Sequence, residues 1–350
     1  MPRLQSVERF AFEFLAELCS TYSPSGSEAS LAPLIDRECR RLGGAFRVFP
    51  LAPGRANILA LWGEPRVLFT THLDVVPPEL PVLIEAGRIA ARGACDAKGQ
   101  IAAQFGAIDT LLQEGLCGMA WLGVAGEESD SAGALAALEL APLFSSCLAI
   151  VNGEPTNCAL AAGQKGYLRA KLSCAGLSAH GSTPELGRNA VAELIAWISA
   201  LDRVEPGVDE RLGREAWNLG LIEGGRAANV VPDEAWAELS LRTVPGGRLR
   251  AALEAAMPAN ARLDALVDES HDYFDLVPGL ASASVPFGSD LPALRALAPN
   301  AAALLAGPGN PALAHTRNEE LSLEELKNGI ALFAAIGRRY LRDATTGNTL

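Results

Sequence analysis

Apolar and polar positions along the chain form two kinds of region. In the outer parts of the sequence, short apolar runs bounded by Gly and Pro alternate with stretches in which apolar residues recur at helical spacing. The runs predict strands at 57–63, 65–76, 119–125 and 147–153, and the helical stretches lie at 6–19, 28–42, 98–114 and shortly after Ser131. Strands that alternate with helices predict an α/β sheet with helices on both faces. Because these strands are apolar along their length, we expect them to be buried on both sides.

The middle of the sequence, residues 163–274, follows a different order. Its pattern predicts a strand, a helix, two strands, a helix and a strand, at 165–174, 189–201, 217–222, 230–243, 248–257 and 261–269. This β-α-β-β-α-β order is typical of a ferredoxin-like unit. After residue 274, short apolar runs again alternate with stretches of helical spacing, and the last of these is a long helix from Leu323 to about Leu341. We therefore expect a discontinuous α/β domain over 1–162 and 275–350, with an inserted α+β domain over 163–274.

Composition and charge exclude several classes of protein. The 350 residues are 49% hydrophobic and 20% charged, which is the balance of a globular protein with a substantial core. The net charge is −12 and no basic run occurs that would neutralise phosphates, so nucleic acid is not an expected partner. No window has the roughly 18 apolar residues of a membrane span, and the N-terminal stretch lacks the apolar core of a signal peptide. Seven scattered cysteines without a CxxC pair indicate reduced thiols, and we expect a cytoplasmic protein.

Side chains of the kind that bind metals stand at the ends of the predicted strands. His72 and Asp74 are two residues apart at the end of one strand, where residues i and i+2 share a face. A carboxylate beside a histidine ligand fixes the tautomer and orientation of that histidine. Further segments supply Asp96, the pair Glu127 and Glu128, Glu154 and, far downstream, His315. Each of these residues alone would be read as a structural histidine or as a solvated turn.

Taken together, these segments indicate a metal centre. Two histidines and three carboxylates suit two divalent ions, with one carboxylate bridging them and a water between them. Zinc accepts this mixture of nitrogen and oxygen ligands best, although cobalt or manganese could substitute. Open α/β sheets place their ligands at the carboxyl ends of strands, which is where these residues stand. The expected cofactors are therefore two Zn²⁺ ions.

A series of motifs, in the same order along the chain, resembles one known family. The motifs are THLDVVP, ARGACDAKG, GEESDSAGA, NGEPT, SAHGSTPELGRNAV, ANVVP and GPGNPALAHTRNE. They resemble the di-zinc aminoacylase and exopeptidase family that includes acetylornithine deacetylase, succinyl-diaminopimelate desuccinylase, carboxypeptidase G and aminoacylase. The resemblance runs from about residue 70 to the last helix. It implies a zinc-exopeptidase-like α/β/α catalytic domain with a mixed sheet, and an inserted domain that serves as a lid or dimerisation domain.

The resemblance also implies a role for each candidate residue. It assigns His72 and Glu154 to one zinc, Glu128 and His315 to the other, Asp96 to both as the bridge, and Glu127 to the general base. Asp74 is expected to support the catalytic centre from its place on the same strand face as His72. The resemblance further implies a cis peptide bond between Asp96 and Ala97. Ala97 departs from the many relatives that carry Met at this position, which puts the subfamily in doubt and leaves the chemistry unaffected.

Two residues of the middle region acquire a role only through the resemblance. His180, in GLSAHGSTP, would by itself be read as a surface histidine in a turn. The resemblance implies instead that His180 stabilises the oxyanion that forms when an amide is attacked, often by reaching across a dimer. It implies that Asn229, in ANVVP, assists His180. We therefore expect a homodimer formed through the inserted domain.

Two further segments are candidates for binding the substrate's carboxylate. Arg242, in SLRTVPG, could pair with it as a bidentate fork, or could be an exposed strand arginine. The turn with Gly307, Gly309 and Asn310 could offer backbone N–H groups, because glycine lets the chain approach a ligand closely. A plain loop is the alternative for this turn.

These residues predict a metal-dependent amidohydrolase. A water between the metals would lose its proton to Glu127 and attack an amide carbonyl, and Glu127 would return the proton to the leaving amine. The substrate expected is a small N-acyl amino acid or a dipeptide, most closely that of an acetylornithine deacetylase of arginine biosynthesis. The alternatives are a hydrolase that frees lysine or ornithine from an amino-group carrier protein, a desuccinylase or a dipeptidase, and a catalytically silent relative. Serine hydrolysis is disfavoured because no GxSxG motif occurs.

Overall fold

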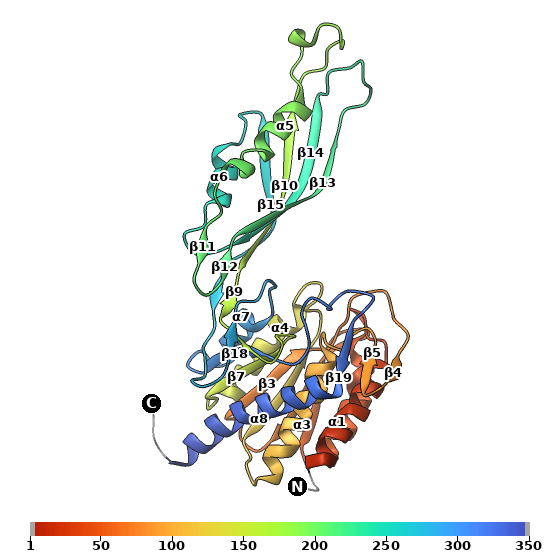
Figure 1. Cartoon of the computed structure of the whole chain (residues 1–350), viewed down its shortest axis with the longest axis vertical. Coiled ribbons are helices and arrows are strands. Elements are labelled where there is room, and N and C mark those ends of the chain that lie inside the picture. The colour runs from red at the N-terminus through yellow and green to blue at the C-terminus, as the bar shows by residue number, and fades with distance from the viewer. Residues whose placement is uncertain (1–3, 347–350) are drawn as a thin grey trace. The chain divides into compact units, whose positions relative to one another are not determined.

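The computed structural model describes residues 4–346 and divides the chain into two compact units (Figure 1). The first unit comprises Met1–Ala161, Phe274–Ala283 and Ser289–Leu350, and the second comprises Ala162–Tyr273 and Ser284–Gly288. The second unit therefore interrupts the sequence of the first. Within residues 4–346, no helix is long and apolar enough to cross a membrane.

A mixed sheet of six strands forms the centre of the first unit. Its strands, in spatial order, are β1 (Ala45–Ala52), β2 (Arg55–Trp62), β6 (Met119–Val124), β3 (Val67–His72), β7 (Ala149–Gly153) and β18 (Ala302–Ala306). The last four are parallel to one another, whereas β1 and β2 run antiparallel to their neighbours. The predicted α/β class with a mixed sheet is thus confirmed. The sequence pattern did not reveal β1, because this edge strand is largely exposed and lacks a continuous apolar run.

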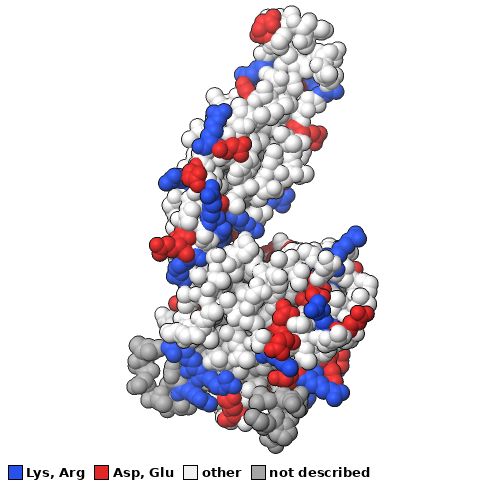
Figure 2. Space-filling view, viewed as in Figure 1, with Lys and Arg blue, Asp and Glu red and all other residues white. Residues whose placement is uncertain are grey.

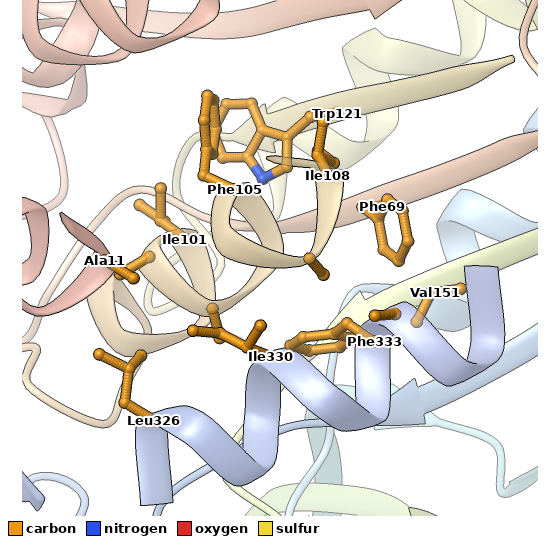
Figure 3. Packing of buried hydrophobic residues seen from close by; sticks show 14 of the residues in the cluster. Ala11, Phe69, Ile101, Phe105, Ile108, Trp121, Val151, Leu326, Ile330 and Phe333 are labelled. Atoms are coloured by element: carbon orange, nitrogen blue, oxygen red, sulfur yellow. The ribbon is translucent and has the colours of Figure 1, made fainter. Parts of the chain in front are cut away.

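Three long helices pack together against this sheet: α1 (Leu4–Cys19), α3 (Lys98–Gln113) and α8 (Leu323–Thr346) (Figure 1). In Figure 3, Phe105 of α3 lies against Trp121 of β6, and their ring centroids are 5.2 Å apart. Ile330 and Phe333 of α8 point into the same apolar cluster, and Phe333 meets the edge of Phe69. α3 is buried on nearly all sides, and the turn that carries Asp96 leads directly into its first residue.

Shorter elements complete the first unit. The helices are α2 (Ala32–Arg41), α4 (Ala132–Ala137) and α7 (Leu291–Leu294). A small sheet joins β4 (Leu83–Glu85), β5 (Arg88–Ala90) and β19 (Glu320–Ser322), and β8 (Leu160–Ala161) pairs with β17 (Ser282–Ala283). The pairing of β5 with β19 brings together segments more than two hundred residues apart in the sequence.

The second unit is a four-stranded antiparallel sheet with two helices. The strands, in spatial order, are β13 (Ala216–Gly224), β14 (Glu234–Thr243), β10 (Gly166–Ala175) and β15 (Ala261–Glu269). The helices α5 (Ala190–Ile198) and α6 (Leu249–Ala255) are joined by the buried indole of Trp197, which donates a hydrogen bond to the Leu253 carbonyl (2.7 Å). Short strands β9 (Gly163–Gln164), β11 (Val208–Asp209), β12 (Gly213–Arg214) and β16 (Asp272–Tyr273) complete the unit. The expected β-α-β-β-α-β order of its main elements is confirmed.

Charged side chains are intermixed on the surface of both units. On the face shown in Figure 2, Lys and Arg lie among Asp and Glu, and wide areas carry neither. The acidic balance of the sequence is therefore not concentrated on this face.

Candidate metal centre

Four neighbouring parallel strands bring most of the predicted ligands to one edge of the sheet. Strand β3 ends at His72, Glu127 and Glu128 follow β6, Glu154 follows β7, and His315 lies in the loop after β18. The carboxyl ends of parallel strands meet at the same edge, where open α/β sheets bind their ligands. Asp96 reaches this group from the turn before α3. The fold thus gathers segments that the sequence keeps far apart.

Asp96 lies between the two histidines. Its Oδ1 is 2.9 Å from Nε2 of His72, and its Oδ2 is 3.2 Å from Nε2 of His315. His315 Nε2 also lies 2.9 Å from Oε1 of Glu128. The ligand-type atoms of His72, Asp96 and Glu128 lie within 4.8 Å of one another, so these three side chains could hold an ion. The Asp96–Ala97 peptide bond is cis, as the resemblance implies.

The electrostatics of the cluster favour a positive ion. Burial raises the pKa of the Glu127 and Glu154 carboxyls well above the usual range; His72 opposes this effect, and neighbouring carboxylates add to it. Hydrogen bonds to Asp96 and Glu128 raise the pKa of His315 to about 10. Oε1 of Glu154 is buried without a hydrogen-bond partner among the described residues. Buried carboxylates with an open oxygen are suited to a cation, so the residues present fit a divalent-metal centre.

Asp74 supports two of the candidate segments. Nδ1 of His72 lies 2.9 Å from the Asp74 main-chain oxygen and 3.4 Å from its carboxylate Oδ1, which orients the imidazole. The Asp74 carboxylate is fully buried and accepts the backbone N–H groups of Gly126, Glu127 and Glu128, each at 3.2 Å. Asp74 therefore also fixes the turn that carries both glutamates, a role that the sequence did not indicate.

Gly126 explains why this turn needs a glycine. Its φ is +83°, and a Cβ at this position would lie 2.0 Å from a guanidinium nitrogen of Arg55. Arg55 forms a bidentate pair with Asp130 (2.7 and 2.8 Å), which closes the turn on its other side. The turn with Glu127 and Glu128 is thus held by the buried Asp74 on one side and by the more exposed Arg55–Asp130 pair on the other, all within the first unit.

His180, Asn229 and Arg242 belong to the second unit. His180 is exposed, and its Nδ1 accepts the backbone N–H of Ser182 (3.1 Å), so the neutral ring carries its proton on Nε2. The Gly181 N–H donates to the Asn229 carbonyl (2.7 Å), so the structure brings the His180 and Asn229 loops together. The Arg242 guanidinium lies over the Tyr167 ring, 4.1 Å from its centroid.

The turn with Gly307, Gly309 and Asn310 requires a correction. The Gly307 N–H donates to Thr156 Oγ1 (2.9 Å), so the prediction that this group is free for a substrate carboxylate is wrong. Gly307 is needed for packing, since a Cβ there would lie 1.9 Å from Oε1 of Gln100. Gly309 has a φ of +96°. The role of Gly309 and Asn310 in binding a substrate carboxylate stays a prediction.

Three residues at the centre were missed in the sequence. The Ser25 hydroxyl donates to Oδ2 of Asp74 (2.6 Å), and a buried ion pair joins Arg92 and Glu319 beside the Asp96 turn. Arg92 stands four residues before Asp96, and Glu319 stands four residues after His315. Opposite charges flanking two candidate ligands were a weak signal for this pair. Nothing in the sequence indicates the contact of Ser25 with Asp74.

The fold and the cluster define a hydrolase class with a candidate metal site of histidine and carboxylate side chains at the carboxyl edge of a mixed sheet. The chain belongs to peptidase family M20/M25/M40, whose model matches residues 68–339. It is a hydrolase of peptide-type amide bonds, and the resemblance seen in its motifs is confirmed at the level of the family.

Similar proteins include one curated relative and two solved structures. A probable carboxypeptidase of Aspergillus clavatus is 33% identical over 360 residues, which covers 91% of this chain and 79% of the relative. The aminopeptidase PepT from Bacillus cereus has a TM-score of 0.78 at 20% identity and covers 95% of this chain and 98% of its own. The Bacillus subtilis YXEP protein, described as a dinuclear metal binding peptidase, has a TM-score of 0.70 at 16% identity over 97% and 99% of the chains. The two structures establish the fold alone.

Proposed function

We propose that the chain is a two-metal exopeptidase-type amidohydrolase, which releases an amino acid with a free carboxylate from a small peptide or an acyl group. One observation carries this proposal. The two carboxylate oxygens of Asp96 face two different histidines, His72 and His315, at 2.9 and 3.2 Å. A carboxylate placed between two imidazoles in this way is suited to bridging two ions.

The remaining ligands divide between the two positions. Glu128 touches His315 (2.9 Å) and would share its ion, and Glu154, whose Oε1 is unpaired among the described residues, would join His72. The dinuclear centre described for the Bacillus subtilis protein supports the number of ions. Nitrogen and oxygen ligands together favour zinc, with cobalt or manganese as substitutes.

Glu127 is the proposed general base. Two ions held at this centre would polarise an amide carbonyl and lower the pKa of a water. Glu127 accepts the proton of the attacking water on its carboxylate and delivers it to the nitrogen of the leaving amine. Asp74 keeps Glu127 in position by accepting its backbone N–H. Asp74 also accepts the backbone N–H of Glu128, whose side chain would bind an ion from the same turn. Two adjacent glutamates thereby serve two purposes.

His180, Asn229 and Arg242, all in the second unit, are the proposed groups for substrate recognition. With the Nδ1 of His180 engaged by Ser182, its Nε2–H is free to donate to the negative charge that develops on the carbonyl oxygen, and Asn229 assists it. Arg242 is the proposed partner of the substrate carboxylate, because its stacking on Tyr167 fixes the plane of the guanidinium fork. A homodimer formed through the second unit stays part of this proposal.

Two substrate classes fit the same chemistry. The Aspergillus clavatus relative is named a probable carboxypeptidase, which favours a peptide with a free C-terminal carboxylate. The CDAKG, GEPT and AHTRNE motifs favour an N-acyl amino acid, as for an acetylornithine deacetylase, a desuccinylase or a carrier-protein hydrolase. Both classes of substrate present an amide next to a free carboxylate. They differ in the group that carries the amide carbonyl, which is an amino acid in a peptide and a simple acyl group in an N-acyl amino acid.

The test combines metal analysis with a substrate panel. The purified protein, loaded with Zn²⁺, should contain two ions per chain and should hydrolyse at least one dipeptide, C-terminally free peptide or N-acyl amino acid. The ranking of dipeptides against N-acetylornithine and N-succinyl amino acids then selects the class. Two bound ions without hydrolysis of any of these amides would instead indicate a silent relative.

A further inference from the structure

A buried ion pair joins Arg92 and Glu319 in the first unit. The Arg92 guanidinium lies 2.6 Å from Oε2 of Glu319, and their side chains are only 3% and 0% exposed. Removing two charges from water costs free energy that their attraction does not always recover, so such a pair is weak evidence for stability. The other hydrogen bonds of these two side chains show what the pair holds in place.

The second oxygen of Glu319 holds the backbone beside Asp96. Oε1 of Glu319 accepts the N–H of Asp96 at 3.2 Å and the N–H of Cys95 at 3.3 Å. An ionised carboxylate makes stronger hydrogen bonds to N–H donors than a neutral acceptor does. Glu319 therefore fixes the residue whose own carboxylate faces both His72 and His315.

Arg92 connects the same pair to the His315 loop. Its guanidinium donates to the carbonyl of Thr316, the residue after His315, at 3.1 Å. Its Nε donates to the carbonyl of Pro78, in the loop after β3, at 3.3 Å. Arg92 and Glu319 thus link the backbone at Asp96, through buried hydrogen bonds, to the backbone beside His315, through a partly buried one.

We propose that Arg92 and Glu319 are positioning residues of the metal centre. They hold the Asp96 turn and the His315 loop at the separation that lets one carboxylate face both histidines. Arg92 and Glu319 form hydrogen bonds with one another and with the backbone beside Asp96 and His315 rather than with the candidate ligand side chains, so both act through Asp96 and His315. This inference rests on the proposed function, because it requires a two-metal centre.

Glu215 offers a matched control in the second unit. This buried carboxylate also accepts backbone N–H groups, from Gly207 (2.9 Å), Arg248 (2.7 Å) and Leu249 (3.2 Å). Glu215→Gln and Glu319→Gln therefore remove the same kind of charged acceptor from two different places. A purely structural role predicts that both variants lose stability and neither loses metal affinity.

The experiment titrates Co²⁺ into the metal-free full-length chain and records its visible absorption and the thermal unfolding midpoint. We expect Glu319→Gln to weaken Co²⁺ binding about 10- to 100-fold, as loss of a group behind a metal ligand typically does, and to alter the spectrum. Glu215→Gln should bind Co²⁺ like the unmodified chain. The milder Arg92→Lys keeps the buried charge but loses hydrogen bonds, and should shift the spectrum with a smaller loss of affinity.

Each other outcome has a separate meaning. If the unmodified chain binds no Co²⁺, the proposed function fails. If it binds two ions and Glu319→Gln matches its affinity and spectrum, the positioning role fails alone. Equal weakening of Co²⁺ binding in Glu215→Gln would show that the loss of affinity is not specific to the Asp96 turn, against this proposal. Failure of both Glu319→Gln and Arg92→Lys to fold would assign the pair to folding, against this proposal.

Discussion

The metal-type cluster of the first unit and the His180 loop of the second unit differ in how their side chains are held. In the first unit, Asp96 and Glu128 are nearly enclosed, and buried carboxylates accept the N–H groups of the turns that carry them. In the second unit, His180 is exposed and is held by Ser182 two residues away. The first region is held by contacts between segments that are far apart in the sequence, whereas His180 is held by a neighbour in its own loop.

Because their side chains are held differently, we expect the two regions to respond differently to substitution. Removing Asp96 or Glu128, the nearly enclosed members of the cluster, would leave neighbouring charges unpaired, so we expect metal binding and stability both to depend on them. Removing His180 deletes an exposed side chain whose hydrogen bonds in the described structure go to Ser182 in the same loop, so its loss should affect turnover far more than stability.

Glu127→Gln is expected to have the largest effect on turnover. The amide keeps the shape of the side chain but cannot accept a proton, and loss of a general base typically lowers the rate about 10²- to 10⁴-fold. Metal content, measured by elemental analysis, should stay unchanged. The matched variant Glu128→Gln should instead lose affinity for one ion. If both variants merely lost metal, the division of roles between the two glutamates would be wrong.

His180→Ala is expected to lower kcat about 10²- to 10³-fold, which is typical for loss of one oxyanion donor. Because the side chain is exposed, the free energy of unfolding should change by no more than about 0.5 kcal/mol. His271→Ala is the control, since His271 is another exposed histidine of the second unit. Steady-state kinetics with metal analysis would decide. Full activity in His180→Ala would contradict the proposed role.

The fold class and the gathering of most candidate ligands could be predicted from the sequence, because these ligands follow an apolar strand or, for Asp96, precede a helix, whereas His315 lies in a longer loop after β18. The supporting contacts could not. Asp74 reaches three N–H groups of the glutamate turn only because β3 pairs with β6, with His72 opposite Val124. Arg92 and Glu319 are 227 positions apart, and only the folded chain shows that they meet. Local patterns therefore indicate the ligands, and long-range pairing decides what holds them.

Arg242→Ala is expected to have the smallest of these effects and to separate substrate binding from chemistry. A hydrogen bond to a charged group contributes about 1.5–3 kcal/mol, so kcat/KM should fall roughly 10- to 100-fold, mainly through KM. Arg169→Ala is the control on the same face of the second unit's sheet, where Arg169 pairs with Glu238 at 2.7 Å. Substrates with an amidated carboxylate should be cleaved equally by the Arg242→Ala variant and the unmodified chain. A large loss of kcat with an unchanged KM would show that Arg242 acts in the chemical step instead.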